Sequence, residues 1–590
     1  MAERIKGVYD DAKRRDINVF LESIKVEDPI IYSVVEVLQG ISLWKTELDT
    51  KGEAYEQFLG GVFKGTMGQY FTPRPIVKFM VDFLEPTDKD LVIDPACGSG
   101  GFLIYTLEKV RNDLEEGLDS KDAEYRWREF ALKQVFGIEV NSQLARISMM
   151  NMIIHDDGHT NIENNDALDN EDKFDPRRSV KLGRFTLLLT NPPFGASVKE
   201  REKSYLANYE LGGKVKKRNR QNTETLFIER CLDFLKPGGR MGIVLPDGIL
   251  TNSSLQYVRD FINEKAKILG VVSLPQAAFK RPASKGSGDT GSGVKASLLF
   301  LRKKKEGELL TTDYPTFMSV AEHIGYDTTG RPDKDEFPEI LESWKKFQNK
   351  NRKGFFTERP CCFTVKRSEV EGRIDPHYYR PEFITHIQRL TKGTCKVIRF
   401  GEIISEMSGG ATPKAKGKAY LKEGGIPFLR VQNITEDGIK LEDVKYINEE
   451  THNGYLKRSK LKPKDLIFTI TGRIGTVAVV PENFGEGNIN QHSVRIHLID
   501  GVNEKYIAFL FNTSLGQSLS LRGVSGGTRI ALDYEAIKSI PIPLPPRRIQ
   551  DQIATIMEEA YKAKKQKEAE VRGLLERAKK EVENIIFGAE

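Results

Sequence analysis

The sequence predicts an α/β protein built around a doubly wound, mostly parallel sheet. Apolar runs alternate with helical patterns between residues 65 and 305, as crossover connections require. A glycine-rich loop at residues 94–101 follows the apolar run 91–93, and a second unusual loop at 191–194 follows the run 185–189. Two strand ends that carry such loops form one crevice in a doubly wound sheet. We therefore expect a ligand site between them.

Local patterns predict the individual elements. Residues up to about 60 place apolar side chains such as Ile30, Val34 and Leu38 near helical spacing, which predicts a helical N-terminal region. Short apolar runs bounded by turn residues predict strands. The runs that we expect to be strands are 91–93, 135–138, 187–189, 241–244, 270–273 and 297–301.

The length and composition limit the possible classes of protein. A chain of 590 residues is too long for one core, so we expect two to four domains. Lys and Arg number 90 against 84 Asp and Glu, a net charge of +6 that does not by itself indicate nucleic acid. The five cysteines form no metal-binding or disulfide pattern, so no metal is predicted. No apolar run could span a membrane and no signal peptide is recognisable, which predicts a cytoplasmic protein.

Changes in composition and in the pattern of apolar residues along the chain predict five parts. The second half has short strands, many glycines and a proline-rich connector at residues 541–546, after which a long helix begins. The expected parts are a helical region at 1–60, an α/β domain at 61–305, a mixed connecting segment at 306–372, a second α/β domain at 373–546 and a long helix at 547–590.

The last helix carries apolar residues at alternating spacings of three and four, as in a coiled-coil seam. They include Ile549, Ile553, Ile556, Val571, Leu574 and Ile585, with a polar stretch at residues 564–570. Some forty helical residues would reach roughly 60 Å. The pattern favours a spacer or dimerisation helix over a helix packed on its own domain.

The two loops together suit methyl transfer to an amine. A glycine loop alone also occurs in plain tight turns, and two prolines alone can form a rigid strand exit. As a pair, the first loop can hold a nucleotide-like cofactor and the second a planar amine. The Asn191 side-chain oxygen and the Pro192 carbonyl can accept the amine hydrogens, and Phe194 can stack on the base. A sulfonium donor needs no general base, so alignment and electrostatics are the protein's task.

Residues 65–305 resemble the modification subunit of type I restriction-modification systems, within the N6-adenine DNA methyltransferases. The segments that carry the resemblance are 68–73, 94–101, 137–139, 165–168, 191–194 and 235–239. The resemblance implies S-adenosylmethionine as cofactor and a flipped adenine in duplex DNA as substrate. It also implies that residues 191–194 (Asn191, Pro192, Pro193 and Phe194) form the catalytic tetrapeptide.

The resemblance assigns cofactor contacts to individual positions. It implies that Glu139 accepts from ribose hydroxyls and that Asp166 accepts from the adenine amino group of the cofactor. Without the resemblance, Glu139 could be a solvated or capping carboxylate and Asp166 a turn residue. The full expected set is Tyr70, Phe71, Thr72, Asp94, Ala96, Gly98, Gly100, Gly101, Phe102, Glu139, Asp166, Ala167 and Asn191.

The C-terminal half resembles a target-recognition domain of the type I specificity subunit. The matching segments are 373–379, 409–413 with 425–430, 461–466, 526–528 and 544–546. Specificity subunits of this family usually carry two recognition domains and two spacer helices, whereas this chain has one of each. We therefore expect a homodimer that pairs through the last helix and reads a two-part site.

Basic and amide side chains supply the expected DNA contacts. A glycine-flanked run after the catalytic loop suits phosphates, and an aromatic near residue 279 corresponds to one that sandwiches the flipped base in the family. In the recognition domain, side chains that read base edges or bind phosphates are candidates. Surface polarity or core packing is the alternative for each. The expected set is Lys214, Lys216, Lys217, Arg218, Arg220, Phe279, Lys280, Arg281, Thr412, Lys414, Arg430, Gln432, Asn433, Arg473, Gln491 and Arg529.

The sequence thus predicts a sequence-specific DNA adenine methyltransferase with its own recognition domain, belonging to a restriction-modification or related defence system. A phosphate loop of the Gly-x-x-x-x-Gly-Lys-Ser/Thr kind is missing, so ATP-driven cutting would need a separate restriction subunit. The alternatives are an N4-cytosine, RNA or protein methyltransferase and an inactive or partner-dependent DNA-binding subunit.

Overall fold

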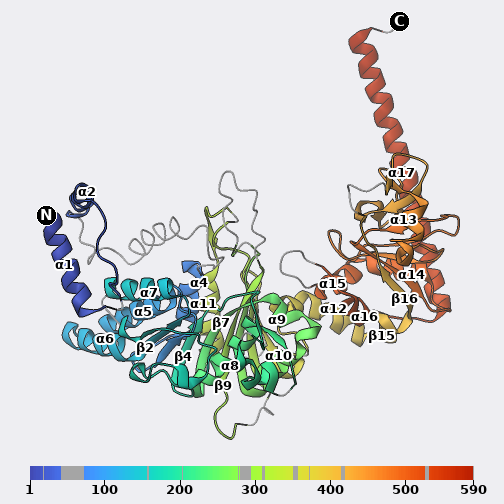
Figure 1. Ribbon diagram of the computed structural model, residues 1–590. Coiled ribbons are helices and arrows are strands. Elements are labelled where there is room, and N and C mark those ends of the chain that lie inside the picture. Colours follow the sequence, from blue (N-terminus) through green and yellow to red (C-terminus); the bar gives the residue numbers. More distant parts are fainter. Residues whose placement is uncertain are drawn as a thin grey trace. The chain divides into compact units, whose positions relative to one another are not determined.

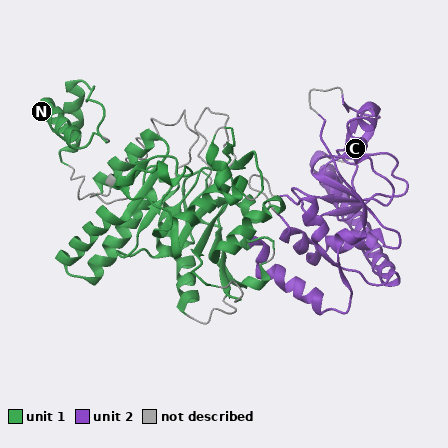
Figure 2. Ribbon diagram, turned by 60° about the horizontal axis from the view of Figure 1, so that its bottom comes forward, with its two compact units in different colours: residues 1–376 green, residues 377–590 purple. Residues whose placement is uncertain are grey.

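The computed structural model divides into two compact units, residues 1–376 and 377–590 (Figure 2). Each unit has its own hydrophobic core. The structure describes residues 1–17, 19–40, 72–155, 159–201, 203–214, 216–276, 278–279, 294–308, 313–327, 329–349, 356–370, 372–413, 419–524 and 531–588.

A ten-stranded sheet organises the first unit, in the order β13-β14-β10-β8-β9-β7-β4-β1-β2-β3. The strands contain the six apolar runs expected from the sequence, except that Leu91 precedes β1. Their bounds are β1 Val92–Asp94, β2 Val135–Glu139, β3 Ile162–Asn164, β4 Phe185–Thr190, β7 Leu235–Pro246, β8 Ala266–Ser273, β9 Ala296–Lys303, β10 Pro315–Val320, β13 Phe356–Thr357 and β14 Cys361–Lys366.

Strand direction brings the expected loops to one edge of the sheet. Strand β1 pairs in parallel with β2 on one side and with β4 on the other, and β4 pairs in parallel with β7. The loops after β1, β2, β4 and β7 therefore lie at the same edge, and the connection order reverses between β1 and β4. This confirms the predicted α/β class and places both motif loops beside the reversal point.

The sheet is mixed, because two of its strands, β9 and β14, run opposite to the others. Strand β9 runs antiparallel to both β7 and β8, and β14 runs antiparallel to β10 and β13. The stretch 306–372, whose placement the sequence left open, supplies β10, β13 and β14 to this sheet. Its short apolar runs pair with distant strands, and nothing local in the sequence encodes that register.

Helices cover both faces of the sheet (Figure 1). Val92, Leu187 and Val244 face the core beneath α4, α5, α6 and α11, and the alternate residues Ile93 and Leu188 are buried on the other face. Helix bounds are α4 Arg74–Leu84, α5 Gly101–Gly117, α6 Ser120–Gln134, α7 Ser142–Ile154, α8 Thr223–Phe234, α9 Asp247–Thr251, α10 Gln256–Lys265 and α11 Phe337–Asn349.

Stacked aromatic side chains hold α11 against α4 and the sheet. The Phe83 ring stacks on Phe300 with 3.7 Å between centroids and on Trp344 with 4.2 Å. The Trp344 indole N–H also donates to the Phe83 carbonyl at 3.1 Å. Aromatic pairs contribute about 0.5–1.5 kcal/mol each beyond the area that they bury. The segment beyond β9 is therefore part of the same core.

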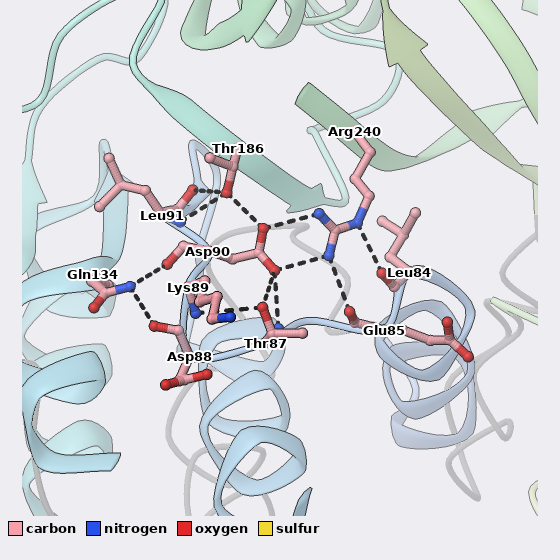
Figure 3. A network of polar contacts seen from close by, with 10 residues as sticks. All are labelled: Leu84, Glu85, Thr87, Asp88, Lys89, Asp90, Leu91, Gln134, Thr186 and Arg240. Carbon is pink, nitrogen blue, oxygen red and sulfur yellow. Dashed lines mark hydrogen bonds and ion pairs between the residues drawn. The ribbon is translucent and has the colours of Figure 1, made fainter. Parts of the chain in front are cut away.

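A polar network closes the amino end of β1 (Figure 3). The Asp90 carboxylate accepts two hydrogen bonds from the Arg240 guanidinium, both 2.9 Å, and one from the Thr186 hydroxyl at 2.7 Å. The Thr87 N–H donates to the same carboxylate at 2.9 Å. Because Arg240 lies in β7 and Thr186 in β4, the network ties three neighbouring strands together.

The N-terminal region contains α1 (Ala2–Arg15) and α2 (Asp28–Leu38), and the described residues between these two helices are not helical. Residues 41–60 of the predicted helical region lie outside the described residues. In the part of the chain that the structure describes, no helix is long and apolar enough to cross a membrane.

The second unit is built from two four-stranded sheets, β16-β25-β22-β23 and β17-β21-β18-β24. Short helices pack on them. The strand bounds are β15 Val397–Arg399, β16 Ile404–Gly409, β17 Tyr420–Leu421, β18 Ile426–Leu429, β19 Ile434–Thr435, β20 Gly438–Ile439, β21 Lys445–Ile447, β22 Leu466–Thr469, β23 Val477–Val479, β24 Asn488–Ile489, β25 Ser493–Leu498 and β26 Pro541–Pro543. The helix bounds are α12 Pro381–Lys392, α13 Glu449–Asn453, α14 Glu504–Asn512, α15 Ser514–Arg522 and α16 Tyr534–Ser539.

The long C-terminal helix, α17 (Arg547–Phe587), has an anchored half and an exposed half. Gln550 accepts the Asn503 N–H at 2.9 Å, and the Tyr561 ring stacks on Phe509 at 5.6 Å. Beyond Lys564, the helix extends away from the rest of the second unit (Figure 1). The apolar side chains there are exposed, among them Val571, Leu574, Val582 and Ile585.

Candidate active site

The glycine loop connects β1 to the start of α5. Gly98 and Gly100 have φ of +54° and +88°, a region that side chains disfavour, and a Cβ at Gly100 would lie 2.8 Å from the Ser148 hydroxyl oxygen. Gly100 is the N-cap of α5 and has no side chain to cover the first helical N–H groups. Such a helix start is suited to binding a polar ligand group. Gly101 and the buried Phe102 form the first turn of α5.

Asp94, the last residue of β1, carries an almost completely buried carboxylate. Its side chain is 1% exposed, and Oδ1 accepts the Ala96 N–H at 3.0 Å. Burial is the main reason that the pKa of Asp94 is raised to about 7, and the negative charge of Glu139 contributes to that rise. A carboxyl group kept in this state is stabilised by any ligand that offers a positive charge or a hydrogen-bond donor.

Glu139 ends β2 and joins two loops. Its Oε2 accepts the Gly98 N–H at 3.0 Å and its Oε1 accepts the Asn141 N–H at 2.8 Å. Burial raises the pKa of Glu139, and these two backbone donors oppose the rise. Each carboxylate oxygen has a second lone pair, so the predicted ribose contact remains chemically available. The sequence did not reveal that Glu139 also holds the glycine loop.

Asp166 already has side-chain partners at the edge of the same crevice. Its Oδ2 accepts from Lys203 Nζ and from the Tyr205 hydroxyl, both at 3.1 Å, and its Oδ1 accepts the Leu168 N–H at 3.0 Å. Ala167 is buried beside it. The predicted contact to an adenine amino group would share the carboxylate with Lys203 and Tyr205.

The second motif loop begins at Asn191, directly after β4. The Asn191 amide Nδ2 donates to the Thr72 hydroxyl at 2.9 Å. The Asn191 Oδ1 is buried and accepts no hydrogen bond from any described residue. A buried acceptor without a donor costs about 1–3 kcal/mol. The loop therefore presents an acceptor that is ready for a donor from a ligand.

Two aromatic residues predicted for base binding lie together. The rings of Phe194 and Phe279 meet edge to face with 6.4 Å between centroids. Phe279 is 8% exposed, whereas Phe194 is half-buried. In the same loop Pro192 is buried and Pro193 is exposed. The segment after β8 thus places the Phe279 ring against the Phe194 ring of the Asn191 loop.

A basic hairpin follows this loop. Strands β5 (Ser197–Lys199) and β6 (Arg220–Asn222) pair antiparallel and place Lys199 opposite Arg220. Lys214, Lys216, Lys217 and Arg220 are exposed, and the guanidinium of Arg218 lies 4.0 Å from the Tyr257 ring centroid. Lys199 was missing from the predicted set, because only the strand pairing places it beside the basic run.

The second unit has a pocket that contains three of the predicted DNA contacts, Thr412, Arg430 and Gln491. The Thr412 hydroxyl donates to Gln491 Oε1. The sequence did not single out three further lining residues, Lys422, Lys445 and His492. The described residues of the lining are Thr412, Tyr420, Leu421, Lys422, Phe428, Arg430, Val444, Lys445, Asn490, Gln491 and His492, and they include Lys422, Arg430 and Lys445 but no acidic side chain.

The family model of N-6 DNA methylases matches residues 46–373. The chain belongs to the N-6 DNA methylase family. Residues 393–572 match the type I restriction modification DNA specificity domain. One chain thus combines an N-6 DNA methylase part and a DNA specificity part, and both resemblances expected from the sequence are confirmed.

Two curated relatives of this methylase come from Escherichia coli. It is 26% identical over 256 residues to the type I restriction enzyme EcoEI methylase subunit, covering 43% of this chain and 46% of the relative. It is 28% identical over 271 residues to the type I restriction enzyme EcoKI methylase subunit of strain K12, covering 43% and 44%. The chain therefore spans less than half the length of these relatives.

The fold is also that of a solved structure, a nuclease-deletion mutant of the type ISP restriction-modification enzyme LlaGI in complex with a DNA substrate mimic. The TM-score is 0.50 at 12% identity, with 90% of this methylase and 58% of that chain covered.

One predicted contact in the specificity part is used internally. Asn433 is 1% exposed, its Oδ1 accepts the Arg430 N–H at 3.0 Å, and its Nδ2 donates to the carbonyls of Lys440 and Glu442. These bonds shape the turn after β18 and leave the Asn433 amide no exposed group for a DNA contact. Gln432 and Arg473 are exposed.

The remaining predicted residues lie outside the described part of the methylase. They are Tyr70, Phe71, Lys280, Arg281, Lys414 and Arg529.

Proposed function

We propose that the first unit transfers a methyl group from S-adenosylmethionine to the N6 amine of an adenine extruded from duplex DNA. The observation that carries the proposal is the buried Asn191 Oδ1 without a donor at the end of β4. An exocyclic amine supplies the donor that this oxygen lacks. The membership of the chain in the N-6 DNA methylase family supports adenine as the base.

The chemistry assigned to the loop is alignment. Asn191 Oδ1 and the Pro192 carbonyl accept the two amine hydrogens, which draws the nitrogen lone pair out of the ring and toward the methyl donor. Phe194 stacks on the extruded base, and Phe279 supports Phe194 from the side. Holding the reacting atoms in line is worth several powers of ten in rate, and extrusion is needed because the amine is inaccessible within the duplex.

The residues around the glycine loop fit S-adenosylmethionine. The cofactor is cationic and carries ribose hydroxyls, and the two buried carboxyl groups of Asp94 and Glu139 are poised for such a ligand. When bound, the cofactor supplies an activated methyl group. The residues that we assign to its binding and that the structure describes are Thr72, Asp94, Ala96, Gly98, Gly100, Gly101, Phe102, Glu139, Asp166 and Ala167, whereas Asn191 is assigned to the target amine.

Duplex DNA is the proposed macromolecular substrate. The exposed basic hairpin neutralises phosphates near the extruded base, since phosphate contacts dominate such affinity. The pocket around Arg430 and Gln491 reads base edges of one half-site, with Lys422 and Lys445 on flanking phosphates.

Two copies of the chain read the complete site, and the exposed half of α17 pairs them. Val571, Leu574 and Val582 are each more than half exposed and supply the apolar seam. Sedimentation of wild type and of Leu574→Lys tests this proposal. We expect a dimer for wild type and a dissociation constant raised at least about 100-fold by a buried lysine. A monomeric wild type, with and without DNA, would exclude the dimer.

A separate ATP-dependent restriction subunit is the further partner proposed.

The decisive experiment identifies the methylated nucleoside. Purified protein is incubated with methyl-labelled S-adenosylmethionine and mixed-sequence duplex DNA, and the DNA is digested to nucleosides. Label in N6-methyladenine supports the proposal, whereas label in N4-methylcytosine would identify cytosine and not adenine as the methylated base. No label in any nucleoside, with the protein folded and the cofactor bound, contradicts catalysis by this chain alone.

A further inference from the structure

The loop that carries Asn191 depends on a neighbouring helix for its shape. Pro192 and Pro193 have no N–H group, so the loop cannot hold itself by its own backbone donors there. Gly195 has a φ of +74°, which marks the turn where the chain leaves the motif. The first turn of α8 lies against this turn and provides the missing bonds.

Thr223, the first residue of α8, binds the loop twice. Its N–H donates to the Ala196 carbonyl at 3.1 Å. Its hydroxyl donates to the Pro193 carbonyl at 2.9 Å and lies 3.2 Å from the Ala196 carbonyl oxygen. One side chain thus spans the exit of the loop from Pro193 to Ala196.

Glu224 holds the same turn from its inner side. Its side chain is 5% exposed, Oε2 accepts the Gly195 N–H at 3.3 Å, and Oε1 accepts from Asn222 Nδ2 at 3.1 Å. A carboxylate only accepts hydrogen bonds, and it is favoured in the first turn of a helix, where the macrodipole is positive. Glu224 is therefore matched to an N–H of the loop and to the helix start together.

We propose that Thr223 and Glu224 are positioning residues for methyl transfer, acting through Asn191 and Phe194. The inference rests on the proposed function of that loop. The two residues fix the chain immediately after Phe194, so a loss of their bonds lets the acceptor and the aromatic ring move together. A displacement of about 1 Å in such a site costs about 100-fold in rate. Neither residue is assigned to cofactor binding, so we expect the affinity of the protein for S-adenosylmethionine to stay unchanged.

Paired substitutions test the proposal by activity. Thr223→Val removes the hydroxyl at nearly constant volume, and Thr223→Ser restores it. The matched control is Thr225→Val, because the buried Thr225 hydroxyl has no hydrogen-bond partner among the described residues. We expect Thr223→Val and Glu224→Ala to lower the single-turnover rate of DNA methylation about 10- to 100-fold. Thr223→Ser, Glu224→Gln and Thr225→Val should stay within about threefold of wild type.

Cofactor affinity and base extrusion separate positioning from general damage. Equilibrium dialysis with labelled S-adenosylmethionine should give dissociation constants within twofold for all variants. With 2-aminopurine at the target position, Thr223→Val should lose the fluorescence rise that accompanies extrusion in wild type. Variants that unfold at lower temperature but keep the wild-type rate in the folded fraction would overturn the proposal.

A last measurement is independent of catalysis. Hydrogen exchange of the peptide covering residues 191–196 reports Asn191, Phe194, Gly195 and Ala196, because the two prolines have no amide hydrogen. We expect exchange at Gly195 to rise at least tenfold in Glu224→Ala and to remain unchanged in Thr225→Val. Unchanged exchange in Glu224→Ala would overturn the proposal, whether or not the wild type methylates adenine.

Discussion

The two ends of strand β1 hold buried aspartates in opposite electrostatic states. Asp90 precedes the strand and is 6% exposed, and Asp94 ends it and is 1% exposed. Burial raises the pKa of Asp90, but the hydrogen bonds and charge of Arg240 outweigh burial and leave the pKa lowered (Figure 3). At Asp94 burial prevails, and the pKa rises to about 7.

This contrast separates the stabilising end of the sheet from the ligand-binding end. At the amino end, the Asp90 carboxylate is paired with Arg240 from a neighbouring strand, so the network contributes to stability. At the carboxyl end, the carboxyl of Asp94 and the amide oxygen of Asn191 are buried with less than they could bind. Buried polar groups without enough partners destabilise the free protein, and they strengthen ligand binding when the ligand supplies the missing partners.

The largest expected effect is on catalysis at the carboxyl end. Asn191→Ala should lower the single-turnover methylation rate by about 1,000-fold, because the lost oxygen stabilises the reacting amine. The dissociation constant for S-adenosylmethionine should stay within about twofold. The free energy of unfolding should change by at most about 1 kcal/mol, because removal of the unpaired Oδ1 offsets the lost hydrogen bond from Nδ2 to Thr72. Rapid-quench kinetics and equilibrium dialysis measure the two effects. A variant that keeps most of its rate would contradict the assignment of Asn191.

The next effect concerns stability at the amino end. Asp90→Asn leaves Arg240 without its ion pair partner, and we expect the free energy of unfolding to fall by about 3 kcal/mol. Urea denaturation followed by circular dichroism measures the loss. The folded fraction should bind S-adenosylmethionine as wild type does. Weaker cofactor binding in that fraction would break the separation between the two ends.

The sequence located the loops of the carboxyl end but not the polar network of the amino end. Glycines and prolines directly after apolar runs mark the loops at residues 94–101 and 191–194, because each restricts the backbone locally. The Asp90–Arg240 pair joins strands that are far apart in the chain, and no local pattern announces it. The same reason explains why Thr223, Glu224 and the sheet strands after residue 306 were missed.

A pH experiment compares the two aspartates directly. An Asp with a raised folded pKa binds its proton more tightly in the native state, so stability falls as pH rises from the unfolded value near 3.9 toward 7. Asp94→Asn removes this penalty. Its free energy of unfolding relative to wild type should rise by about 3 kcal/mol between pH 4.5 and pH 8 and then level off.

Asp90 supplies the opposite sign as the control. Its lowered folded pKa means that its contribution is present above the unfolded value and is lost as pH falls through the folded value. The difference between Asp90→Asn and wild type should therefore be flat between pH 5 and pH 8. A flat difference for Asp94→Asn as well would show that the Asp94 carboxyl titrates normally in the folded protein.

The smallest expected effect concerns DNA binding beside the carboxyl end. Lys217 is exposed in the basic run, and Lys89 is an exposed lysine of the amino-end loop. Lys217→Ala should reduce the slope of log K against log salt by about 1, with no change in sequence preference, because a phosphate contact releases one counterion. Lys89→Ala should leave the slope unchanged. Equal slopes for the two variants would mean that DNA binding depends only on the total charge of the protein. The basic hairpin would then have no specific role in DNA binding, and the ligand-binding role would belong to the loops of the carboxyl edge alone.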